Sequence, residues 1–109
     1  MERMGQVIRL RPEALDEYKR IHAAVWPEVL SLLSACNITN YSIFLKEPEM
    51  LMFAYWEYTG TDFAADIDKM KAEPRMHDWW RMTDPMQSPF EQRGEGEWWA
   101  QMKPVFFHA

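Results

Sequence analysis

The apolar residues of this 109-residue chain switch several times between the spacing of a strand and the spacing of a helix. The stretch 5–11 (GQVIRLR) is aliphatic and β-branched, which predicts a strand. Over 13–26 the apolar residues recur at helical intervals, and acidic residues at the start suit the positive end of a helix dipole. Pro27 disfavours a continuous helix, so we expect a break there and a second helical segment over 27–36.

The middle of the chain has the pattern of a β-hairpin. Residues 38–46 (ITNYSIFLK) and 50–58 (MLMFAYWEY) are rich in β-branched and aromatic residues, and the tripeptide EPE at 47–49 is typical of a turn. Thr61 or Asp62 is suited to cap a following helix. The remaining predicted segments are a helix over 62–73, a shorter one over 75–82 after Pro74, a loop over 83–97 and a late strand over 98–109.

These elements predict a single domain over 1–109 of the α+β class. Their order is β-α-β-β-α-β, which is the ferredoxin-like arrangement of an antiparallel sheet with helices on one face.

The strand over 50–58 is apolar on both faces, whereas a strand with one wet face alternates apolar and polar residues. The helices can cover only one face of the sheet, so the other face needs a ligand or a second subunit, and we expect a homodimer with sheets face to face. One face carries Met50, Met52, Ala54, Trp56 and Tyr58, and the other carries Leu51, Phe53 and Tyr55.

Composition narrows the class of function. A net charge of −5 with no basic run argues against nucleic acid as a partner, because that contact begins with clustered Lys and Arg. No apolar run is long enough to cross a bilayer, and the N-terminus lacks the pattern of a signal peptide. With a single Cys, the chain is expected to be cytoplasmic and to have no membrane partner.

The first helix contains a candidate pair for proton transfer. Tyr18 and His22 are four residues apart and therefore share one helix face. His22 could act as a general acid or base near neutral pH, with the Tyr18 hydroxyl bonded to a substrate. The alternative is that both side chains only pack against the core.

Other aromatic residues suggest a binding surface. Tyr41, in NYSIF, is either a core tyrosine or a further polar-tipped aromatic residue on the sheet. Trp79 and Trp80 are adjacent in a helix and point about 100° apart, so at least one must line a groove or an interface. A second Trp pair, in EWWAQM over 97–102, is interpreted as packing or subunit contact. The scattered His residues and lone Cys predict neither a metal site nor a cofactor.

Three of these motifs together resemble the L-rhamnose mutarotase family. EYKRIHAAVWPE, NYSIF and WWRMTD occur in the family's order and at matching spacing, and the resemblance extends to the closing VFFHA. It implies a dimeric ferredoxin-like fold of the α+β barrel type, and a cofactor-free enzyme that interconverts the α and β anomers of L-rhamnose. The stretch 81–99 matches only some relatives.

The resemblance also assigns roles to residues. It implies that His22 is the catalytic residue and that the sugar is bound by Tyr18, Tyr41, Trp79 and Trp80. Alternatives are a mutarotase for a related sugar such as L-fucose, or a dimeric ferredoxin-like small-ligand binding protein or monooxygenase, because this fold serves several functions.

Overall fold

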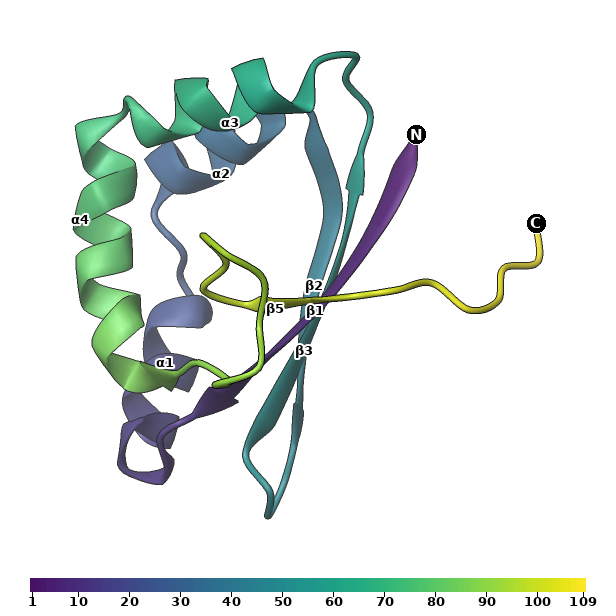
Figure 1. Ribbon diagram of the computed structural model, residues 1–109. Coiled ribbons are helices and arrows are strands. Elements are labelled where there is room, and N and C mark those ends of the chain that lie inside the picture. The colour runs from purple at the N-terminus through teal and green to yellow at the C-terminus, as the bar shows by residue number, and fades with distance from the viewer.

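An antiparallel sheet carries four helices on one of its faces (Figure 1). The computed structural model describes residues 1–109, and the strand order is β2-β3-β1-β4, with β5 also paired to β1. The strands are β1 (Glu2–Leu10), β2 (Ile38–Lys46), β3 (Leu51–Tyr58), β4 (Gln87–Ser88) and β5 (Ala100–Met102). The helices are α1 (Leu15–His22), α2 (Pro27–Ala35), α3 (Phe63–Lys71) and α4 (Pro74–Thr83), with short 3₁₀ turns η1 (Pro12–Ala14) and η2 (Asp84–Met86). None of these helices is long and apolar enough to cross a bilayer.

This order confirms the predicted ferredoxin-like fold. Each helical connection between strands consists of two helices, and the second helix of each pair begins at a proline, Pro27 in α2 and Pro74 in α4. The break before Pro27 has the expected cause, because Trp26 takes an extended ψ of 132° as the residue before a proline. The first helix nevertheless ends at His22, four residues earlier than predicted. Asp62 is the cap of α3, since its carboxylate accepts a hydrogen bond from the Ala65 N–H at 3.1 Å.

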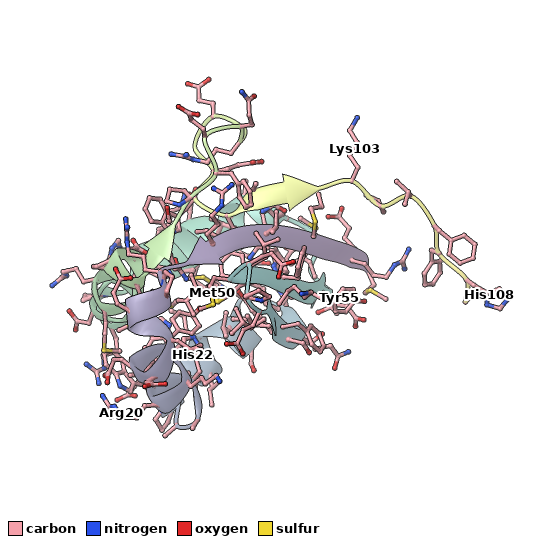
Figure 2. All side chains as sticks on the ribbon, turned by 90° about the horizontal axis from the view of Figure 1, so that it is seen from below. Arg20, His22, Met50, Tyr55, Lys103 and His108 are labelled. Carbon is pink, nitrogen blue, oxygen red and sulfur yellow. The ribbon has the colours of Figure 1, made fainter.

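The prediction of a strand over the whole of 98–109 was wrong in extent. Only Ala100–Met102 pairs with β1, and the chain leaves the sheet before Pro104, which has no N–H to donate. The tail beyond it extends past the sheet on the side away from the helices (Figure 1). Figure 2 shows Lys103 and His108 along this tail.

The two faces of β3 have different surroundings. Met52, Ala54, Trp56 and Tyr58 are buried beneath the helices. On the opposite face Phe53 lies between Val7 of β1 and Phe44 of β2 in register, and Phe44 is 65% exposed. Tyr55 forms the next row on that face, and Figure 2 shows it on the sheet away from α1. Both faces of β3 are therefore apolar over most of its length, as the sequence predicted, and no helix covers the outer one.

A β-bulge in β2 determines which way Tyr41 points. Thr39 and Ser42 pair with Glu57 and Tyr55, so two residues of β2 lie opposite one residue of β3. The extra residue is accommodated by Asn40, whose φ is +50°. Because of the bulge, Tyr41 faces the helices and lines the same cavity as Ile43.

Candidate active site

A cavity of about 640 Å³ lies between the helical layer and the inner face of the sheet. Its volume is in the range of small-molecule sites, and its walls are mostly apolar and aromatic. All five residues that the sequence singled out line it: Tyr18, His22, Tyr41, Trp79 and Trp80.

The rings of Tyr18 and His22 stack in α1, with centroids 4.0 Å apart and planes inclined by 22°. The His22 Nδ1 is 2.8 Å from the backbone carbonyl oxygen of Tyr18. A carbonyl oxygen accepts hydrogen bonds and never donates them, so Nδ1 carries a proton and donates it to this bond. In the neutral imidazole, Nε2 therefore holds the free lone pair.

His22 is half-buried, and this burial lowers the pKa of its imidazole below the usual value of 6.5. The hydrogen bond to the Tyr18 carbonyl works in the opposite direction and is the smaller effect. The edge of Trp79 adds to the apolar surroundings, with ring centroids 5.3 Å apart. The imidazole is therefore neutral at pH 7 and able to accept a proton.

The two tyrosines of the cavity remain protonated at neutral pH. Burial is the main cause that raises the pKa of Tyr18 to about 12, and burial also raises the pKa of Tyr41 to about 12. Their hydroxyls serve as hydrogen-bonding groups rather than as bases. Asp84 is the one carboxyl group among the cavity residues, and burial raises its pKa as well.

The adjacent tryptophans of α4 both reach the cavity but differ in burial. Trp79 is 6% exposed and packs edge-on against Trp26, with ring centroids 5.1 Å apart. Trp80 is half-buried, and His77 packs against it edge-to-face at 5.3 Å. Trp79 is thus part of the core, whereas Trp80 packs against the core and remains partly exposed.

Five polar or tryptophan residues of the cavity were not predicted as site residues from the sequence: Thr83, Asp84, Gln87, Trp98 and Trp99. The EWWAQM pair was interpreted as packing because adjacent strand residues point to opposite faces. Strand β5 begins only at Ala100, so Trp98 and Trp99 lie in a bend and both line the cavity. Nothing in the sequence pattern distinguishes Gln87, although its side chain is buried and hydrogen-bonded on both sides.

No group of three or more His, Cys, Asp and Glu side chains is close enough to hold a metal ion. The residues that line the cavity carry one imidazole, three hydroxyls, one carboxyl group, one amide and several indole rings. Such a set is suited to binding a small polyhydroxylated ligand and to moving protons on it.

A family model and the sequences of known proteins both relate this chain to L-rhamnose mutarotases. The family model described as L-rhamnose mutarotase matches residues 3–108. The L-rhamnose mutarotase of Listeria monocytogenes is 37% identical over 86 residues, which are 79% of this chain and 80% of that protein. The L-rhamnose mutarotase of Sinorhizobium fredii is 36% identical over 89 residues, 81% of this chain and 83% of that protein.

Two solved structures share the fold. The L-rhamnose mutarotase of Formosa agariphila superposes with a TM-score of 0.79 at 21% identity, with both chains covered completely. The tetracenomycin F2 cyclase of Streptomyces glaucescens, a type-II polyketide cyclase, superposes with a TM-score of 0.70 at 14% identity, again with full coverage. At these identities both similarities concern the fold alone.

Proposed function

Since this chain belongs to the L-rhamnose mutarotase family, we propose that it opens and closes the ring of L-rhamnose with His22 as the group that transfers the proton. The enzyme is an isomerase that acts on a carbohydrate. The observation that carries the role of His22 is its hydrogen bond to the Tyr18 carbonyl, which leaves Nε2 as the proton acceptor at the cavity.

The reaction needs only proton movement. Ring opening removes the proton from the anomeric hydroxyl O1 and adds a proton to the ring oxygen, and closure on the other face of the aldehyde reverses both steps. Neutral His22 takes the O1 proton at Nε2 and, as the imidazolium, delivers it to the ring oxygen, which lies on the same carbon as O1. On closure Nε2 takes the proton back from that hydroxyl and gives it to the former aldehyde oxygen. The Tyr18 and Tyr41 hydroxyls hold the sugar by hydrogen bonds, and the aromatic walls keep it in the orientation for transfer.

The two adjacent tryptophans are expected to respond differently to replacement by Phe. Trp80→Phe keeps an aromatic ring at the cavity wall but loses the indole N–H, which should weaken sugar binding by about 1 kcal/mol. Trp79→Phe removes volume from a buried position, so it should mainly lower the melting temperature. Sugar titration and thermal melts on both variants test this division, and unchanged binding in both would contradict it.

Anomer-exchange NMR tests the choice of sugar. We expect the fastest exchange for L-rhamnose in a panel that includes L-fucose, L-mannose and D-ribose. Faster exchange of L-fucose would favour the alternative of a mutarotase for that sugar. If no sugar in the panel is exchanged, the alternative of a small-ligand binding protein or a monooxygenase would be favoured. The similarity to the cyclase concerns the fold only and does not choose between these functions.

The uncovered outer face of the sheet supports a homodimer. One row of apolar residues, Phe44, Phe53 and Val7, crosses β2, β3 and β1 in register, and Leu51 and Tyr55 of β3 lie on either side of it. A second copy, packed face to face, would remove this surface from water, and a specific dimer buries about 1,600 Å² in total. The enzyme is proposed to act in the cytoplasm, where Cys36, buried and unpaired, would stay reduced.

A further inference from the structure

Gln87 joins the late loop to the first helix. Its side chain is 4% exposed, and its backbone is fixed by the pairing of β4 with Leu10 of β1. The Trp98 indole Nε1–H donates to the Gln87 Oε1 at 2.8 Å, and the Gln87 Nε2–H donates to the Tyr18 hydroxyl oxygen at 3.2 Å. Three residues distant in sequence therefore form one hydrogen-bonded chain that ends at the cavity.

Trp98 determines the orientation of this chain. An indole N–H is a donor only, so the amide of Gln87 must turn its oxygen toward Trp98 and its NH₂ toward Tyr18. The Tyr18 oxygen consequently accepts from Gln87, and its own proton stays free for another partner. The pKa of Tyr18, raised to about 12, keeps that proton in place at neutral pH.

The loop that carries Trp98 has a defined internal structure. The Arg93 guanidinium donates to the carbonyl oxygens of Phe90 and Glu97, the latter at 2.7 Å. The Glu97 carboxylate accepts from the backbone N–H of Gly94 at 2.9 Å and of Gln101 at 3.3 Å. These bonds hold the residue before Trp98 from both sides, so the backbone that carries the indole has a defined position.

We propose that Gln87 and Trp98 are positioning residues that hold the Tyr18 hydroxyl as a hydrogen-bond donor to the sugar. This rests on the proposed function. It assigns a role to the 89–99 loop, which carries the indole that sets the direction of the whole chain of hydrogen bonds. The sugar oxygen that meets Tyr18 must then be an acceptor.

Gln87→Glu tests the proposal with an isosteric side chain. At pH 7 the carboxylate accepts from both Trp98 and Tyr18, so the Tyr18 proton turns away from the cavity and an acceptor faces the sugar. We expect kcat/KM for L-rhamnose to fall about tenfold, mainly through KM. Between about pH 7 and pH 5 the buried carboxyl takes up a proton and becomes a donor to Tyr18, so the ratio of variant to wild type should rise toward one.

Two further variants complete the test. Gln92→Glu makes the same chemical change at an exposed position of the same loop, and its ratio to wild type should stay at one throughout. Trp98→Phe alters a side chain that is 39% exposed and should fold, but it frees the amide of Gln87 to rotate. We expect it to lose about two- to fivefold in kcat/KM, without recovery at low pH.

The outcomes separate this proposal from the proposed function. A ratio for Gln87→Glu that is one at pH 7, or reduced equally at both pH values, would overturn the positioning role. If the wild type fails to exchange L-rhamnose anomers, the proposed function is wrong, and the ring ¹³Cζ shift of Tyr18 then decides. That resonance, identified with Tyr18→Phe, should move with pH in the wild type only through the titration of the stacked His22 ring. It should move further in Gln87→Glu, and equal movement in the two proteins would refute the proposal.

Discussion

Replacement of His22 by Ala is expected to slow the exchange of L-rhamnose anomers by roughly 10²–10⁴-fold. The imidazole is the group at the cavity that is neutral at pH 7 and has a free ring nitrogen. The fold should survive, because His22 is only half-buried and its one hydrogen bond is to its own helix. NMR exchange rates and melting temperatures measured on the same variant check both parts.

Matched variants make the result specific. His22→Asn should be almost as slow as His22→Ala, since an amide forms hydrogen bonds but does not exchange protons near neutral pH. His108→Ala removes an imidazole from the exposed tail and should keep the wild-type rate. A His22→Ala variant that melts early but exchanges anomers normally would show that the Tyr18–His22 pair serves packing alone.

The titration of His22 should affect both the exchange rate and the stability of the protein as the pH changes. Because its folded pKa lies below 6.5, the rate should be full at pH 7 and should fall only on acidification below that usual value. In the window between the lowered folded pKa and about 6.5, the unfolded chain binds more protons, so stability falls as the pH drops. His22→Ala should lose this part of the pH dependence, which melts between pH 7 and 5 would measure.

Elements with a strong local signal could be predicted from the sequence. Strand β2 has the predicted bounds, and β3 begins one residue later than expected. Proline marks the start of α2 and α4, because its fixed φ suits a first helical turn. The Tyr18–His22 stack follows directly from helical spacing. These features depend on neighbours in the chain, which the sequence displays.

Features that depend on distant contacts could not be predicted. Gln87 belongs to the site because a two-residue strand pairs with β1 and because Trp98 returns from a loop eleven residues on. The end of α1 at His22 has no breaker within four residues of it in the sequence. The β-bulge at Asn40 has no recognisable signal in the sequence pattern, although it turns Tyr41 toward the cavity.

The second large effect concerns assembly. The wild type is expected to sediment at micromolar concentration with twice the chain mass, and Phe53→Glu should convert it to a monomer. Phe53 lies at the centre of the uncovered outer face, between Val7 and Phe44. Burial of a Phe side chain stabilises by about 1.5–3 kcal/mol, and a twofold interface contains the residue twice. The substitution should therefore weaken the dimer by roughly 10²–10⁴-fold, before any cost of desolvating the carboxylate.

A charge on the helical side of the molecule provides the control. Leu30 of α2 is 51% exposed, so Leu30→Glu places the same carboxylate on an apolar surface residue away from the outer face. It should leave the sedimenting mass at that of the dimer, whereas Phe53→Glu halves it. Equal masses for both variants would locate the interface elsewhere. A wild type that sediments as a monomer would refute the dimer, and the Phe44–Phe53–Val7 row would then remain exposed to water in the free protein.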